Sequence, residues 1–462
     1  MGDLVDELWR GVHPQRTAMP PLRLVGQPVI ESAFAVSDLA TASIATAGLA
    51  LAEFLQLLTD VTTEVTVDRT LADAWFRPVL TPIGWELPSP WDDIAGDYET
   101  ADGWIRLHTN APHHKVAALA VLARGRREPR TARAVATAVK HWHGAELERA
   151  IVEAGGCAAE LRTEDEWLTH PHGSAVTAEE LVAFASTTGA AGRYWQPNPV
   201  RPLAGIRVLD LTRVIAGPVA TRFLAGFGAD VLRIDSPDWN EPAIVPEMTL
   251  GKRSARLDIQ RDPDVLRELI AGADIVVHGY RADALDRLGF SDRELEAIRP
   301  GIVTARLNAY GWTGPWRDRR GFDSLVQFSS GIADTGRAVA GGERPVALPV
   351  QALDYATGFL TAAAAIVGLG TQLRAGYGSA ASLSLARTAR TLVTANQFDP
   401  LRSSHEPQHR ARVAVDASGH QPTLLDTPWG RASLQPAPLT VGAASQRFDL
   451  PPRALGADAA RW

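Results

Sequence analysis

The apolar and polar positions of residues 202–235 follow the pattern of a strand, a helix and a second strand. An apolar run ends in the small-residue loop 214–218, a helical stretch follows, and a second apolar run ends at Asp235. Two apolar strands joined by a helix are typical of a parallel sheet. Because parallel sheets bind ligands at the ends of their strands, the segment predicts an enzyme of the α/β class.

Two stretches without charged side chains, 39–52 and 355–373, raise the question of membrane spans, since the second approaches spanning length. Both stretches are rich in Ala, Thr and Gly rather than Leu, Ile and Phe. Both follow or start at an aspartate, whose charge is costly in lipid. We therefore expect two buried helices of a large soluble core and no membrane partner.

Bulk properties narrow the class of protein. The length of 462 residues predicts two or three domains. A net charge of -7 without a clustered basic run argues against a nucleic-acid partner. The single Cys157 cannot form an intrachain disulfide, and the acidic amino terminus does not follow the pattern of a secretory signal. A cytoplasmic location is expected.

The two uncharged stretches are similar to each other. Asp38 and Asp354 each open an Asp-x-Ala-Thr string that runs into a small-residue helix. At nearly the same distance downstream, residues 66–75 and 381–389 each show a strand that leads into a helix. Two matched pairs in the same order predict a partial internal duplication.

Several motifs resemble those of family III CoA-transferases, the carnitine and bile-acid CoA-transferase group. The strings that carry this resemblance are 203–218, 228–235, 284–290, 307–315 and 347–358, with weaker similarity over 67–176. The resemblance implies an α/β fold with an open, parallel, Rossmann-like large domain and a smaller α+β domain. It also implies an enzyme that takes CoA and acyl-CoA as substrates, together with a carboxylic acid, without a tightly bound cofactor.

The order of the segments differs from the order that the family implies. We predict a first-copy helix and strand at 1–80, a small domain at 81–195, a linker at 196–202, a CoA-binding large domain with the nucleophile helix at 203–398, and a tail at 399–462 that packs on the large domain. Family members form interlocked dimers, so the chain is expected to be a homodimer or an intrachain pseudo-dimer.

Asp354 is the candidate catalytic residue, because the resemblance implies a nucleophilic aspartate at this point of the chain. It would attack a thioester to give a mixed anhydride and free thiolate, and an enzyme thioester would follow. A helix amino terminus would aim N–H groups at the developing oxyanions and keep the carboxylate ionised. An aspartate at a helix start is also a common N-cap. Asp38 is the second candidate, with an N-cap role expected for it.

The phosphates of CoA predict a small-residue loop combined with cations. The residues that we expect at this site are Ala216, Gly217, Pro218, Arg233, Lys252, Arg253, Arg281 and Arg287, with Tyr310 and Gly311 at the acyl pocket. Taken singly, each of these charges is typical of a solvated surface.

Two other functions are kept open. Racemases of the same superfamily use a His-Asp pair where this chain has Phe322 and Asp323, so epimerisation of an acyl-CoA lacks one base here. A catalytically inactive CoA-binding subunit is the alternative from a different class. No metal site is expected, because the His141/His143 and His170/His172 pairs have no acidic or thiol partners at ligand spacing.

Overall fold

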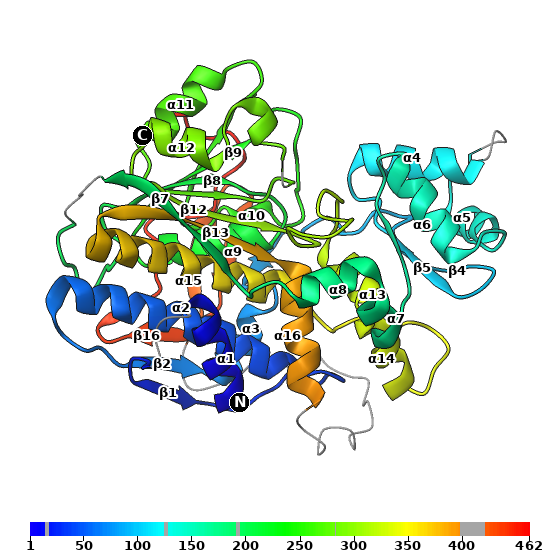
Figure 1. Cartoon of the computed structure of the whole chain (residues 1–462), viewed down its shortest axis with the longest axis horizontal. Coiled ribbons are helices and arrows are strands. Elements are labelled where there is room, and N and C mark those ends of the chain that lie inside the picture. The colour runs from blue at the N-terminus through cyan, green and yellow to red at the C-terminus, as the bar shows by residue number, and fades with distance from the viewer. Residues whose placement is uncertain (14–17, 124–127, 191–194, 282, 398–420) are drawn as a thin grey trace.

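The structure is a computed structural model that describes residues 1–13, 18–123, 128–190, 195–281, 283–397 and 421–462. A seven-stranded sheet forms its centre, with the strand order β10-β9-β8-β11-β12-β13-β7 (Figure 1). These strands are β7 (Ala183–Ala190), β8 (Arg207–Leu211), β9 (Asp230–Asp235), β10 (Arg253–Arg256), β11 (Ile275–His278), β12 (Val303–Asn308) and β13 (Tyr377–Ser384). All neighbours pair in parallel except β13 and β7, which are antiparallel.

The strand order reverses beside β8. From β8 the chain goes outward to β9 and β10, and it then returns to add β11 on the other side, with His278 level with Leu211. The carboxyl ends of β8 and β11 therefore diverge into different connections, which leaves a crevice between them. The expected α/β class with an open, parallel, Rossmann-like sheet is confirmed.

Helices cover both faces of the large sheet. Val208 faces the cluster that contains α9 (Ala216–Gly226) and α15 (Ala352–Ala375), whereas Leu209 faces the cluster of α11 (Pro263–Ala271) and α12 (Asp292–Ile298). Alternate strand residues thus belong to separate cores, as the period of two requires. The remaining elements of this part are α10 (Val245–Met248), a 3-10 helix at Asp286–Leu288, α13 (Asp323–Ser329), α14 (Ile332–Val339) and α16 (Leu385–Gln397).

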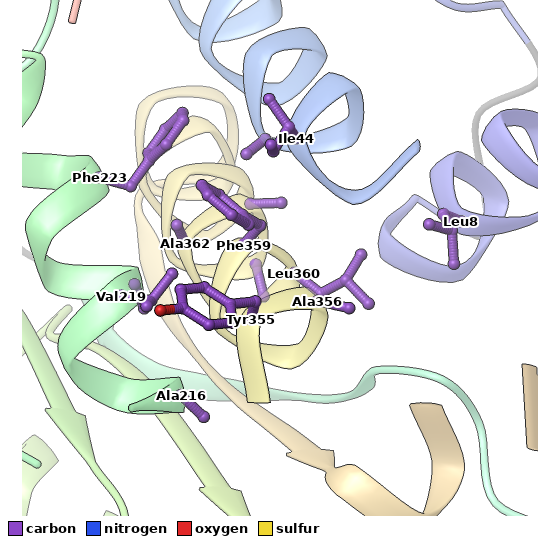
Figure 2. Packing of buried hydrophobic residues seen from close by; sticks show 14 of the residues in the cluster. Leu8, Ile44, Ala216, Val219, Phe223, Tyr355, Ala356, Phe359, Leu360 and Ala362 are labelled. Carbon is purple, nitrogen blue, oxygen red and sulfur yellow. The ribbon is translucent and has the colours of Figure 1, made fainter. Parts of the chain in front are cut away.

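The helix α15 is buried on all sides. It packs against α9, against α2 (Val36–Thr59) and against the sheet, with α1 (Gly2–Val12) nearby. Figure 2 shows Tyr355 and Phe359 of α15 beside Val219 and Phe223 of α9, while Ile44 of α2 lies on another side. Both long helices are apolar enough to cross a membrane, yet 83% and 100% of their most apolar windows are buried inside the structure.

The small domain stands apart in Figure 1 and has its own core. It contains β4 (Gly96–Glu99), β5 (Trp104–Leu107), β6 (Ala158–Glu160), α4 (Pro112–Ala123), α5 (Ala132–Val139) and α6 (Gly144–Glu153). β5 lies between β4 and β6 in an antiparallel sheet. Two short helices, α7 (Glu164–Thr169) and α8 (Pro171–Thr177), lead from this domain to β7 at the edge of the large sheet.

The carboxyl-terminal tail joins the two ends of the chain. Its strands are β14 (Thr423–Thr427), β15 (Gly430–Leu434), β16 (Leu439–Val441) and β17 (Ala444–Ser445). The amino-terminal strands are β1 (Leu22–Val25), which pairs with β2 (Val65–Asp68), and β3 (Leu80–Ile83), with α3 (Arg69–Trp75) after β2. β15 pairs with β3, and β16 pairs with β2. The tail also contacts the large domain, for example through Asp458, which accepts the Ser254 N–H, and Trp462, whose indole N–H donates to the carbonyl of Leu269.

The duplicated segments have equivalent local structures. Each begins with a 24-residue helix whose third residue is Asp38 or Asp354, and each continues with a strand that runs into a helix. These features agree with the predicted duplication. The duplication and the bounds of the five segments stay predictions.

The contact between α15 and α9 depends on a glycine. A Cβ atom at Gly358 would lie 2.5 Å from the carbonyl oxygen of Ala216 and 2.9 Å from Cβ of Val219. We expect Gly358→Ala to lower the free energy of unfolding by about 1–3 kcal/mol, because helix and backbone must separate to accommodate the methyl group. Urea unfolding measures this loss.

Gly370 of the same helix is the matched control. The nearest atom to a Cβ there is Cδ1 of Leu57 at 3.3 Å, which is the end of a flexible side chain. Gly370→Ala should leave stability unchanged or raise it by up to about 1 kcal/mol through helix propensity. Equal losses in the two variants would contradict the assignment of the close contact to Gly358.

Candidate active site

A cavity of about 350 Å³ lies where the carboxyl ends of β8 and β11 diverge. The lining comes from the loops after β8, β9 and β11, the end of β12, the residues before α13, the start of α15 and of α16, and the small-domain helix α4. The lining residues are His113, His114, Leu211, Thr212, Arg213, Val214, Ala216, Gly217, Trp239, Gly279, Tyr280, Arg281, Ala284, Leu307, Asn308, Ala309, Arg319, Arg320, Gly321, Phe322, Asp354 and Leu385. Both domains therefore contribute to one site.

A buried carboxylate fixes the loop after β8. Asp210 accepts hydrogen bonds from the Thr212 amide at 2.9 Å, from the Thr221 hydroxyl at 2.6 Å and from the Lys252 ammonium at 3.0 Å. Burial lowers the pKa of Lys252 to about 8, and Lys252 and further donors lower the pKa of Asp210 against the effect of its own burial. The loop is thus held by charge-assisted bonds that water does not reach.

The next turn of this loop is strained. Val214 has φ 64°, which is rare for a β-branched residue. Its N–H donates to both carboxylate oxygens of Glu241, at 2.9 and 3.2 Å, and Arg233 holds Glu241 and Asp235. Strained backbone of this kind is found at ligand sites, where surrounding bonds enforce it.

Asp354 enters the cavity as the third residue of α15 and is not its N-cap. The N-cap is Gln351, and its side chain makes no capping bond. The N–H groups of Leu353 and Asp354 instead donate to Oδ2 of Asp323, at 2.9 and 3.0 Å. A carboxylate from another helix therefore caps α15.

The two aspartates affect each other's protonation. Burial, and then the charge of Asp323, raise the pKa of Asp354 well above 3.8. Burial likewise raises the pKa of Asp323 to about 6, although its hydrogen bonds act in the opposite direction. The expectation that the helix amino terminus keeps Asp354 ionised is therefore wrong, because Asp323 occupies the N–H groups that would have provided this effect.

Three arginines give the cavity a positive potential. Within the described residues, Arg213, Arg281 and Arg320 form no ion pair with a carboxylate, although Arg320 donates to the Gly155 carbonyl at 3.2 Å. Arg213 lies over the rings of Trp239 and Tyr280, at 4.7 and 5.7 Å. Burial and the nearby charge of Arg320 lower the pKa of Arg281. Such a cluster favours an anionic ligand.

Two histidines of the small domain, His108 and His114, contact the ring of Phe322, and His114 also lines the cavity. The imidazole of His108 stacks on Phe322 with ring centroids 3.7 Å apart, and burial lowers its pKa to about 3. His114 contacts the Cys157 sulfur at 3.6 Å through Nε2, and burial lowers its pKa to about 4. Both imidazoles are therefore neutral at pH 7.

The structure brings together part of the predicted ligand site. Ala216, Gly217, Arg281 and Asp354 line the cavity. Gly217 is required for a different reason than expected, because a Cβ there would collide with the side chain of Thr212 rather than with a ligand.

The other predicted ligand residues lie outside the described cavity lining. Arg233 and Lys252 have no exposed side-chain surface and serve Asp235 and Asp210, so their assignment as ligand cations is corrected. Arg253 pairs with Asp230, and Arg287 pairs with Asp283. The remaining three residues are Pro218, Tyr310 and Gly311. The carbonyl of Pro218 accepts a hydrogen bond from Lys252, and the hydroxyl of Tyr310 contacts that of Ser329. The N–H of Gly311 donates to Asn308.

Asp38 also differs from its expected role. The N-cap of α2 is Ala35, and the carboxylate of Asp38 pairs with Arg69 at 2.8 Å. Asp38 is absent from the described lining of the cavity that contains Asp354.

Several lining residues escaped the sequence analysis. Arg213 is the second residue after the strand β8, and Arg319 and Arg320 directly precede Gly321 and Phe322. Their positions next to recognised motifs were an available signal. No signal in the sequence indicated that α4 lines the cavity, because this depends on how the small domain packs on the large one.

The fold and the site are those of an α/β protein with an arginine-lined crevice and a buried carboxylate. Residues 203–421 match the model of CoA-transferase family III, so the chain contains a region of that family. An acetyl-coenzyme A transferase, nodX, of Hypoxylon pulicicidum is 40% identical over 37% of this chain and 30% of its own length. The succinyl-CoA:glutarate CoA-transferase of Mus musculus is 32% identical over 41% of this chain and 48% of its own.

A solved structure gives a match of similar extent. The hypothetical protein Rv3272 from Mycobacterium tuberculosis is 30% identical, with a TM-score of 0.39, over 44% of this chain and 58% of that one. The chain thus spans about half or less of the length of the two curated relatives.

The raised pKa of Asp354 predicts a stability effect. Since the folded protein favours the protonated form, Asp354 destabilises the fold increasingly as pH rises from 3.8 toward its folded pKa. We expect Asp354→Asn to melt at a higher temperature than the natural protein at pH 8, with a smaller difference at pH 5. A difference independent of pH would contradict this.

Proposed function

We propose that this protein transfers CoA from an acyl-CoA donor to a carboxylic acid, with Asp354 as the nucleophile. The observation that carries the proposal is the carboxylate of Asp354 in an arginine-lined crevice, within the region that matches family III. Two relatives bear names of CoA-transferases that use succinyl-CoA and a dicarboxylic acid. This chain resembles them over less than half of its length.

The proposed reaction keeps its charge balanced. An ionised Asp354 oxygen bonds to the thioester carbonyl carbon, the C–S bond breaks, and the CoA thiolate leaves. The thiolate then attacks the aspartyl carbonyl, which releases the donor acid as a carboxylate and leaves CoA on Asp354. An acceptor acid attacks this thioester, and the same two steps run in reverse to deliver the new acyl-CoA.

The start of α9 is the best source of oxyanion donors. The first-turn N–H groups of Leu353 and Asp354 are already used by Asp323, so α15 does not supply them. Ala216 and Gly217 open α9 and line the cavity, and the N-cap Ile215 makes no side-chain capping bond. Their N–H groups are therefore suited to stabilise charge that develops on the acyl oxygen.

Arg213, Arg281 and Arg320 are proposed to bind the phosphates of CoA. Guanidinium groups form bidentate hydrogen bonds with phosphate oxygens, and these three have no carboxylate partner within the described part of the chain. The rings of Trp239 and Tyr280 next to Arg213 offer surfaces on which an adenine can stack.

One observation favours a second candidate, an acyl-CoA racemase or isomerase. Phe322 replaces the expected histidine, but the neutral imidazole of His114 lines the same cavity as Asp354. A His–carboxylate pair can move the proton next to a thioester carbonyl. Incorporation of solvent deuterium at that carbon would favour this reaction over transfer.

The state of the whole molecule is also a proposal. We infer a cytoplasmic protein without a tightly bound cofactor that is either a homodimer or an intrachain pseudo-dimer, in which α2 and α15 are the equivalent helices. Sedimentation at several concentrations distinguishes the two forms.

Covalent trapping tests the proposed nucleophile. We expect incubation with a panel of acyl-CoAs, followed by hydroxylamine or borohydride, to modify Asp354, and we expect no modification in Asp354→Asn. Peptide mass spectrometry identifies the residue. Asp38→Asn is the matched control, because Asp38 holds the equivalent helix position outside the cavity lining. Loss of the label in that variant would move the nucleophile to the first copy, and CoA binding without any label would favour an inactive CoA-binding subunit.

Substitution of the cavity arginines tests the phosphate site. We expect Arg213→Gln and Arg281→Gln each to raise the dissociation constant for CoA roughly tenfold, since each removes hydrogen bonds to a charged group. Isothermal titration calorimetry gives the constants. Arg287→Gln is the control, because Arg287 pairs with Asp283 at the surface. This variant should bind CoA with the dissociation constant of the natural protein. Equal weakening in all three variants would argue against the assignment.

A further inference from the structure

Asp323, the first residue of α13, accepts hydrogen bonds from the start of α15, the helix that carries Asp354. Its Oδ2 accepts the N–H groups of Leu353 and Asp354, at 2.9 and 3.0 Å. These are the second and third residues of α15, whose N–H groups the side chain of an ordinary N-cap residue accepts. The other oxygen, Oδ1, accepts a hydrogen bond from the Gln327 side chain. Gln327 in turn accepts the Leu348 N–H at 2.7 Å.

This arrangement fixes which member of the aspartate pair carries the charge. Asp323 receives three donors although only 1% of its surface is exposed, and hydrogen bonds to a carboxylate favour its ionised form. Among the described residues no donor bonds to the side chain of Asp354, which is 7% exposed and lines the cavity. Two buried neighbouring carboxylates do not both ionise readily, so the proton goes to Asp354.

We propose that Asp323 is a positioning residue for Asp354: it caps α15 to fix the nucleophile, and its negative charge drives Asp354 toward the uncharged acylated state. This inference rests on the proposed function. When the ionised Asp354 oxygen bonds to an acyl carbon, the negative charge moves to the CoA thiolate, away from Asp323. The repulsion present between the two free carboxylates is therefore relieved by acylation, as it is by protonation.

Other charged and titratable groups surround the two aspartates, and they are the same in the natural protein and in every variant of Asp323. They are Arg106 on β5 and His108 directly after it, His114 on α4, Arg319 and Arg320 before α13, and Arg222 and Glu247 beside Tyr355. None of them bonds to the carboxylate of Asp323 in the described structure, whereas Arg106 is close enough to stabilise its charge. Asp323 is the neighbouring charge that raises the pKa of Asp354.

The charge of Asp323 should affect both the acid limb of the pH profile of kcat/KM and the fraction of Asp354 that is acylated. Asp323→Asn removes the charge but retains an oxygen that can accept the two N–H groups of α15. We expect the acid limb of the pH profile of kcat/KM to move at least about one unit toward lower pH. The fraction of Asp354 trapped as an acyl adduct, measured well above this limb, should fall roughly tenfold for each unit of the shift.

Two variants separate charge from structure. Gln327→Leu retains the carboxylate of Asp323 and its two backbone donors but removes one hydrogen bond, so it should lower stability and move the acid limb by less than Asp323→Asn does. Asp334→Asn, in the surface pair of Asp334 with Arg337 on α14, is the matched loss of a carboxylate and should change neither quantity. A uniform loss of rate in Asp323→Asn with an unmoved limb means a structural role only and overturns the inference.

A measurement without substrate keeps the inference separate from the proposed function. The ¹³C signal of the Asp354 carboxyl group, assigned by its loss in Asp354→Asn, can be titrated in the natural protein. We expect it to titrate above the ordinary carboxyl range, and below that value in Asp323→Asn. Absence of any acyl adduct together with this shift would refute only the transferase proposal. Titration of Asp354 in the ordinary range would refute the influence of Asp323, whatever the variant does.

Discussion

The structure depends on the enclosure of one helix that has no polar face. α15 is rich in alanine and glycine, and its side chains from Ala352 to Gly370 are buried throughout. Such a helix must be surrounded, which α9, α2 and the sheet accomplish together. Small residues allow this close approach, as Gly358 demonstrates against the backbone of Ala216. The enclosed helix then presents Asp354 at the crevice from a support that cannot shift easily.

Buried charge in the large domain serves two separate purposes. Lys252 and Arg233 neutralise carboxylates beneath the loop after β8 and hold that loop in a strained form. Arg213, Arg281 and Arg320 face the cavity without such partners in the described residues. The first group organises the protein, and the second is available to a ligand. The two groups of cations differ in whether they pair with carboxylates and not in residue type.

The fold and the position of Asp354 could be predicted from the sequence, whereas the burial of individual charges could not. The strand–helix–strand pattern of residues 202–235 predicted the parallel sheet, and the register around Asp354 located the residue that enters the crevice. The sequence did not reveal that Lys252 lies beneath the loop rather than above it, because burial depends on contacts with Asp210 and Thr221. Nor did it reveal the capping of α15 by Asp323, since the two residues are far apart in the chain and meet only through packing.

The pairing of β2 and β3 with the tail has a consequence for biosynthesis. β3 ends at Ile83, whereas its partner β15 begins at Gly430, and β2 pairs with β16, which ends at Val441. A ribosome synthesises β2 and β3 long before β15 and β16, so β2 and β3 remain without these sheet neighbours until the tail has emerged. Contacts of such long sequence separation form slowly. The apolar helix α2 would be exposed during this interval, which makes the nascent chain a natural client for chaperones.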